Sequence, residues 1–227
     1  MPVVGVQCRH IGSEAPVNPL SLILGFLPLI AFAVLSGRVA DNGAAWAATV
    51  ACAIAVVLLV VKRTWPPKLV DAFQALVFAV IAVIGFAGGN DVDAWLFDWA
   101  NGLTTTTLGV LILAFVPVLP FTEQYARESV PQEYWGDPTF KRVNRNLSLS
   151  WGVAIVVMGL SSLAVAWLRS RADSTADANL LDLALNWVVP IAVIVAMVRF
   201  TKTYPARVRA EARQGGPPAG AEASGPS

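Results

Sequence analysis

Charged side chains are scarce in this chain: aspartate, glutamate, lysine and arginine together make up 14% of its 227 residues. A typical soluble domain carries about 25% charged residues, so this composition excludes an ordinary soluble domain. The formal net charge is only +1, and no nucleic-acid partner is expected.

Cysteine and histidine are almost absent, with two cysteines and one histidine in the whole chain. Cys52 falls in the middle of an apolar run and Cys8 lies far from it, so no disulfide is expected. Cys8 and His10 are too few ligands for a zinc site. The sequence also lacks a nucleophile elbow, a P-loop, an HExxH motif and a glycine-rich dinucleotide turn. No cofactor is therefore expected, and the sequence leaves open whether the protein is an enzyme.

The sequence instead contains long apolar runs, and 56% of its residues are hydrophobic. A membrane core of roughly 30 Å requires about 20 helical residues. These runs predict an all-α membrane protein with six transmembrane helices in contact with the lipid bilayer. The charge-free runs are 15–37, 42–61, 72–90, 99–122, 146–168 and 183–198.

Lysine and arginine are distributed unevenly between the two ends of these helices. If the N-terminus is cytoplasmic, thirteen of the 16 lie on the cytoplasmic side and three on the other. Basic residues concentrate on the cytoplasmic side of membrane proteins, so both termini are predicted to be cytoplasmic. The chain then divides into a cytoplasmic leader (1–18), a membrane domain (19–204) and a cytoplasmic tail (205–227). The proline, glycine, alanine and serine content of the tail predicts disorder.

The predicted spans contain few polar groups. No ionisable residue lies deep in a span, although proton- and ion-coupled transporters usually have one there. Asp71 and Gln74 share a face at the cytoplasmic end of the third span, where interhelical hydrogen bonds are their expected role. A water-filled cavity lined by Asp71, Gln74 or Asn186 would instead favour transport.

Two further features of the spans concern helix packing. Pro28 is expected to kink the first span, with the freed carbonyl group satisfied by a neighbouring helix. Small residues in the second span recur at three- and four-residue spacing, which allows close approach of helices. We interpret them as packing within the bundle: Ala44, Ala48, Ala51 and Ala55.

Acidic residues gather in the two loops predicted on the non-cytoplasmic side. Carboxylates grouped in this way can hold Mg²⁺ against a diphosphate, which would indicate an enzyme acting on a prenyl or lipid substrate. A topology with basic cytoplasmic loops also leaves acidic loops on the opposite side. We therefore predict no metal site; the carboxylates that could form one are Asp91, Asp93, Asp173 and Asp177.

A polar stretch of mixed chemistry, the elbow (residues 122–147), joins the fourth and fifth spans. The fourth helix is expected to continue through Glu128 and to end before Pro131. Asp137 and Pro138 predict the start of the next helix, because aspartate caps free amides and proline fits the first turn. Two antiparallel helices would then extend into the cytoplasm and bring their polar groups together.

Eight residues of the elbow are candidates for a functional or structural role. The arginines on the two helices are expected to meet just below the headgroups. Asn144 is expected to satisfy carbonyl groups that Pro120 or Pro131 leaves free. The candidates are Gln124, Tyr125, Arg127, Glu128, Trp135, Arg142, Asn144 and Arg145.

The elbow also carries aromatic, proline, arginine and asparagine residues in a specific order: Phe121, Thr122, Gln124, Tyr125, Ala126, Arg127, Glu128, Val130, Pro131, Glu133, Trp135, Pro138, Phe140, Arg142, Asn144, Arg145 and Trp151. This run resembles the signature of an uncharacterised bacterial membrane family labelled intracellular-septation-protein-A-like. Glu123 departs from that signature, in which an apolar residue is expected. The resemblance implies a multi-pass protein of the bacterial cytoplasmic (inner) membrane with a role in division or envelope synthesis, and it implies no particular reaction.

Three interpretations of the elbow remain open. It can be an ordered basic loop, a docking surface for a cytoplasmic or membrane protein, or a pocket in which Arg127, Arg142 and Arg145 bind phosphate. We expect a protein of unknown molecular activity that serves as a non-catalytic scaffold or regulator in the cell envelope or division. The alternatives are a small-solute or lipid transporter and a membrane-embedded enzyme acting on a prenyl or lipid diphosphate.

Overall fold

The computed structural model describes residues 23–36, 42–62, 68–128, 130–171 and 184–214. All regular secondary structure within these ranges is helical, as the apolar runs predict. Among the described residues, four helices are long and apolar enough to cross a membrane, which indicates a membrane protein. They are Gly43–Val61, Leu69–Phe115, Pro138–Arg169 and Val189–Val208. The leader, Asp173 and Asp177 lie outside the described residues.

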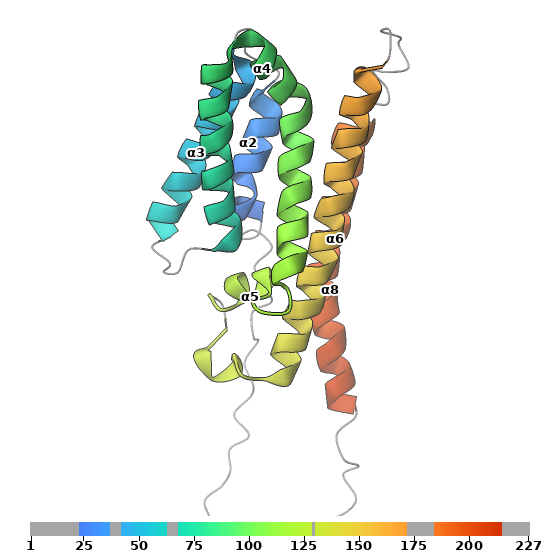
Figure 1. Cartoon of the computed structure of the whole chain (residues 1–227). Helices are drawn as coiled ribbons and strands as arrows, with labels where there is room; N and C mark the ends of the chain where they lie inside the picture. Colours follow the sequence, from blue (N-terminus) through green and yellow to red (C-terminus); the bar gives the residue numbers. More distant parts are fainter. Residues whose placement is uncertain (1–22, 37–41, 63–67, 129, 172–183, 215–227) are drawn as a thin grey trace, which may run out of the picture.

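Helices α2 (Leu27–Leu35) and α3 (Gly43–Lys62) form one side of the bundle with the first part of α4 (Leu69–Phe115) (Figure 1). The rings of Phe32 and Phe78 meet between them, with 5.2 Å between centroids. The four regularly spaced alanines of the second predicted span, Ala44, Ala48, Ala51 and Ala55, are fully buried, and the first three belong to the cluster around this contact. Their predicted packing within the bundle is confirmed.

Helix α4 contains the residues of the third and fourth predicted spans. Its backbone at Gly89 has φ 74° and ψ −173°, a conformation that residues with a side chain rarely adopt. Figure 1 shows that α4 folds back on itself there, so its two arms run in opposite directions. The sequence predicts a loop after Gly89, but residues 90–98 are helical, because this one glycine accomplishes most of the reversal.

Helix α6 (Pro138–Arg169) packs antiparallel to the second arm of α4 through glycines on both helices. A Cβ atom added at Gly109 would lie 2.7 Å from the backbone nitrogen of Val156 and 3.1 Å from the carbonyl oxygen of Gly152. Gly102 and Gly159 make equally close approaches to the facing helix. Larger residues at these positions would hold the two backbones apart.

The connection between α4 and α6 differs from the expected elbow. Helix α4 ends at Phe115 instead of continuing through Glu128. A separate short helix, α5 (Phe121–Ala126), lies across the direction of the long helices (Figure 1). Pro117 and Pro120 account for the difference, because proline lacks an N–H group and disfavours helix in the residue before it.

The start of α6 is as predicted. A single helical turn, η1 (Gln132–Tyr134), leads into it. The carboxylate of Asp137 accepts hydrogen bonds from the backbone N–H groups of Thr139 (2.5 Å) and Phe140 (3.3 Å). Pro138 occupies the first turn, where a missing N–H group costs nothing.

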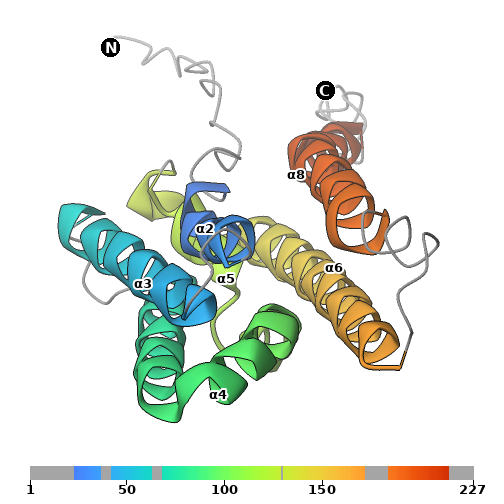
Figure 2. The ribbon, with the colours of Figure 1, turned by 90° about the horizontal axis from the view of Figure 1, so that it is seen from above.

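Helix α8 (Val189–Gln214) follows the π-helical turn η2 (Ala184–Val188) and packs against α6. Trp151 Nε1 donates a hydrogen bond to Thr201 Oγ1 (3.0 Å), and Asn146 Nδ2 donates one to the Tyr204 hydroxyl (2.6 Å). Figure 2 shows α2 and α8 on either side of α6, with no other described helix between them.

The tail differs from its prediction, because α8 continues through Pro205 as far as Gln214. Alanine, arginine, glutamate and glutamine in this stretch favour helix, and their preference exceeds the signal from proline. The remaining tail residues, 215–227, lie outside the described ranges.

Candidate functional site

Polar side chains, most of them buried, gather at the end of the bundle where α5 lies; we call it the α5 end and the opposite one the Gly89 end (Figure 1). They come from the first turns of α4 and from the α5 segment. Burial of charged and amide groups is costly unless each has a partner. The cluster consists of Lys68, Asp71, Gln74, Glu123, Gln124, Tyr125 and Glu128.

Gln74 bridges a break in the first helix. The helix is interrupted at Phe26, and α2 begins at Leu27 with Pro28 in its first turn. In a continuous helix the Gly25 carbonyl group and the Leu29 N–H group would bond to each other. Instead, Gln74 Nε2 donates to the Gly25 oxygen (2.7 Å) and Gln74 Oε1 accepts from the Leu29 nitrogen (3.0 Å). The predicted kink is confirmed, and a buried amide on α4 satisfies the backbone groups at the break.

Tyr125 of α5 packs against this break. A Cβ atom at Gly25 would collide with its hydroxyl group. Lys68 Nζ lies 3.9 Å from the centre of the Tyr125 ring and 2.6 Å from Glu128 Oε1. Burial raises the pKa of Tyr125 well above its usual value of 10.0, and the negative charges of Asp71 and Glu128 raise it further. The phenol therefore remains protonated at neutral pH.

Two side chains fix α5 to the long helices. Gln124 Oε1 accepts a hydrogen bond from the backbone nitrogen of Leu69 (2.9 Å) and so caps the start of α4. The backbone N–H of Thr122 donates to Ser148 Oγ (3.1 Å), and its hydroxyl donates to the carbonyl oxygen of Asn144 (2.8 Å). Because these bonds reach both α4 and α6, they define the position of a helix too short to be stable alone.

Arg127 orders the turn that follows α5. Its Nη2 and Nε atoms lie 2.5 Å and 3.2 Å from Glu123 Oε1, and its guanidinium carbon lies 4.8 Å from the centre of the Trp135 ring. Trp135 Nε1 donates to the Val130 carbonyl oxygen (2.9 Å). The Arg127 side chain is 40% exposed, so solvent screens much of the attraction in this ion pair.

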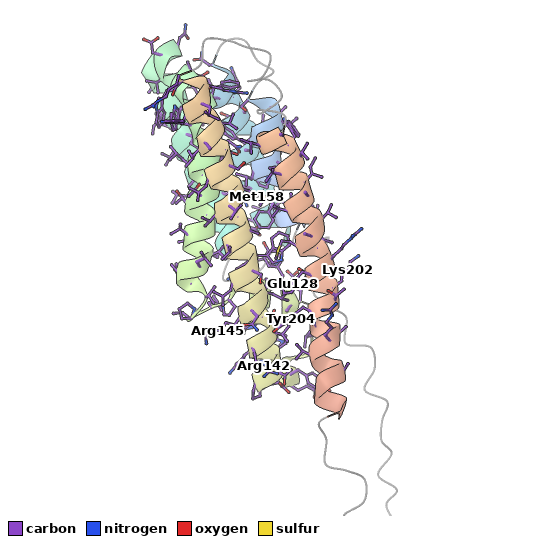
Figure 3. All side chains as sticks on the ribbon, turned by 90° about the vertical axis from the view of Figure 1, so that its right-hand side faces the viewer. Glu128, Arg142, Arg145, Met158, Lys202 and Tyr204 are labelled. Atoms are coloured by element: carbon purple, nitrogen blue, oxygen red, sulfur yellow. The ribbon has the colours of Figure 1, made fainter. Side chains whose placement is uncertain are left out.

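The elbow does not bring its arginines together as expected. Arg142 and Arg145 project from exposed positions on α6, away from α8 (Figure 3), whereas Arg127 faces Trp135. Asn144 is buried and donates to the Phe140 carbonyl oxygen of its own helix (2.9 Å), not to a carbonyl freed by proline. These expectations depend on a fourth helix that continues straight into the elbow, whereas α5 lies across the direction of the long helices. No contact described here joins Arg127 to Arg142 or Arg145, so the structure adds no support for a single phosphate pocket formed by all three arginines.

The carboxylates considered for a metal site have different roles where the structure describes them. Asp93 is buried and accepts hydrogen bonds from the backbone nitrogens of Ala45 (2.9 Å) and Ala44 (3.3 Å). It thereby caps the first turn of α3, where the helix dipole favours a negative charge. Asp91 is exposed. No metal-binding group of histidine, cysteine and carboxylate side chains occurs among the described residues.

A cavity of about 190 Å³ lies between α2, the second arm of α4, α6 and α8. Its wall is largely apolar and includes Phe26, Trp151 and Ile155. Asp71 and Gln74 are not among its lining residues, so it is not the cavity that would favour transport through them. The polar side chains on its wall are Asn101, Thr105 and Ser162.

The sequence patterns do not predict several of the contacts that define this site. The seven-residue spacing from Gly102 to Gly109 and from Gly152 to Gly159 was a readable signal of close helix packing. The bridging role of Gln74 had no local signal, because its partners lie 45 and 49 residues away.

Three comparisons with known proteins give no match: none is found among protein-family models, curated proteins or solved structures.

Proposed function

We propose that this chain is a six-span protein of the bacterial cytoplasmic membrane with both termini in the cytoplasm. We propose further that it acts as a non-catalytic scaffold or regulator in the cell envelope or division. The six spans are the first helix with α2, then α3, the two arms of α4, α6 and α8. The run of residues that resembles the septation-like family supports the link to division.

Aromatic and basic side chains support this placement in the bilayer. Exposed tryptophans collect toward the Gly89 end, as expected of a membrane interface: Trp46, Trp95, Trp167 and Trp187. The exposed cations at the α5 end include Lys141, Arg142, Arg145, Arg199 and Lys202. The preference of basic residues for the cytoplasm then assigns the α5 end to that side.

The observation that carries the scaffold role is the ordered connection between α4 and α6. Thr122 and Gln124 attach it to two long helices, and Arg127 and Trp135 fix its turn. A surface that is already ordered loses little conformational entropy when a partner binds. Exposed arginine near aromatic side chains is also the composition typical of binding hot spots.

Topology is tested first, by thiol labelling of Cys8 in a Cys52→Ala variant. In intact cells, Cys8 should react with a membrane-permeant reagent and not with an impermeant one. Labelling by the impermeant reagent would reverse the orientation.

The role of the elbow is tested by complementing a deletion strain and measuring cell length and septum frequency. The double variant Arg142→Gln/Arg145→Gln should fail to restore the wild-type distribution, although it accumulates in the membrane normally. The matched control, Arg199→Gln/Lys202→Gln, removes the same charge from α8 at the same end. Equal complementation by both variants would refute a specific role for the elbow surface.

A further inference from the structure

The cavity beside α6 has the shape of a slot along the helix axis. Trp151, Ile155, Met158 and Ser162 line it from one face of α6. Trp151 and Ser162 are eleven positions apart on the helix, which corresponds to a rise of about 16 Å. Half of a membrane core of roughly 30 Å is about 15 Å, so the slot is as long as one leaflet is thick.

The end of the slot nearer the α5 end is closed by aromatic rings. Trp151 stacks on Phe26, with 5.9 Å between ring centroids, and its indole nitrogen is bonded to Thr201 of α8. This contact joins α2, α6 and α8 across the floor of the slot. The indole N–H is already used, so the floor presents an apolar surface to whatever occupies the slot.

The other end of the slot is polar. Gly102 touches Leu163, which puts the neighbouring Asn101 and Ser162 at the same height in the bundle. Asn101 is two residues inside the predicted fourth span and Ser162 is six residues inside the fifth, so the two spans together put this level about 3–9 Å from the membrane boundary. Amide and hydroxyl groups at this depth can bond to the ester carbonyl groups of a phospholipid.

We propose that this slot binds one acyl chain of a bilayer phospholipid. The ester carbonyl lies against Asn101, Thr105 and Ser162, and the end of the chain lies on the floor formed by Trp151 and Phe26. The cavity exceeds the roughly 150 Å³ that accommodates a benzene ring in a protein core, so it accepts part of a chain. The remainder of the chain lies toward the bilayer between α2 and α8, which line the cavity through Ile30 and Ile194. The proposal rests on the placement of the helices in a bilayer and not on the role of the elbow.

The test uses the full chain in phospholipid vesicles that contain one of two photoreactive phosphatidylethanolamines. One carries a diazirine next to the ester, and the other carries it at the end of the acyl chain. After irradiation, peptide mass spectrometry locates the labelled residues. The ester-proximal probe should label Asn101 or Ser162, and the chain-end probe should label Trp151 or Phe26.

A matched pair of tryptophan substitutions provides the control. Met158→Trp fills the slot and should abolish labelling of its wall. Val157→Trp adds the same side chain at an exposed neighbouring position and should leave the labelling unchanged. If Met158→Trp does not fold, as judged by circular dichroism, Ile30→Trp replaces it, because Ile30 lines the slot from α2.

Three results would overturn the proposal. In one, the two probes label the ends of the slot in reverse order. In another, the slot-filling variant is labelled as strongly as the wild type. In the third, the wild-type wall is labelled no more than exposed Val153, which would mean that the chain itself or a second copy occupies the slot. Cys8 labelling is read separately, so failure of the topology is distinguishable from failure of this site.

Discussion

Replacing Gln74 by methionine should destabilise the protein more than the loss of two ordinary hydrogen bonds would. Methionine keeps the length and volume of the side chain but removes the amide that bonds to Gly25 and Leu29. Interhelical hydrogen bonds in membranes contribute about 0.6 kcal/mol each, or about 1.2 kcal/mol for two. An unpaired buried backbone group costs about 1–3 kcal/mol, so two unpaired groups would cost about 2–6 kcal/mol.

The outcome depends on whether the broken helix can close and pair Gly25 with Leu29 directly. Tyr125 opposes this movement, because its hydroxyl group packs against Gly25. We therefore expect a loss of more than about 2 kcal/mol in the free energy of unfolding, measured by titration with sodium dodecyl sulfate in mixed micelles. The control is Leu76→Ala on the same helix, where the side chain is 66% exposed. A loss of about 1 kcal/mol or less for Gln74→Met, or one equal to that of the control, would refute the bridging argument.

Three further predictions use the same unfolding assay. Gly109→Ala should cost about 1–3 kcal/mol, because the added Cβ would meet the backbone of Val156. Gly136→Ala should cost far less, because the space around Gly136 is open, and equal effects would contradict close helix packing. Asn144→Ala should cost about 1–3 kcal/mol, because it removes a buried hydrogen bond. Arg127→Lys should cost less because its ion pair is partly exposed, and Lys141→Gln should have no measurable effect. Three equal small losses would mean that the elbow is a simple basic loop. The raised pKa of Tyr125 means that its ionisation favours the unfolded state, so the free energy of unfolding should fall as pH rises above 10.0, by up to about 1.4 kcal/mol per pH unit. Tyr125→Phe should show a smaller fall. The difference in phenolate absorbance between the two folded proteins should appear only well above pH 10.0.

Features that depend on neighbouring residues were predictable from the sequence. Asp137 and Pro138 mark the start of α6 through their own backbone and side-chain chemistry. Leu147 and Trp151 recur at helical spacing and are buried, while Arg142 and Arg145 fall on the exposed side. Such features require only the period of a helix and the properties of its first turn.

Features that depend on the direction of a helix after a break were not predictable. Pro117 and Pro120 explain why α4 ends, but the orientation of α5 follows from its bonds to Ser148 and to the start of α4. The elbow arginines can converge only if the fourth helix continues straight past Pro117 and Pro120, whereas α4 ends at Phe115. A change of axis at a proline alters which side chains can meet, and no local pattern encodes its angle.

The cap that Asp93 provides to α3 has a consequence for the order of assembly during synthesis. The amide groups at Ala44 and Ala45 precede their acceptor by 49 and 48 residues, so α3 leaves the ribosome with these groups unpaired. The acceptor follows Gly89 by four residues, and α4 must turn back before the carboxylate can reach α3. The first turn of α3 can therefore be capped only after Asp93, which precedes the fourth predicted span, has been synthesised. A ribosome stalled before Asp93 would hold an α3 whose first turn is still open to water.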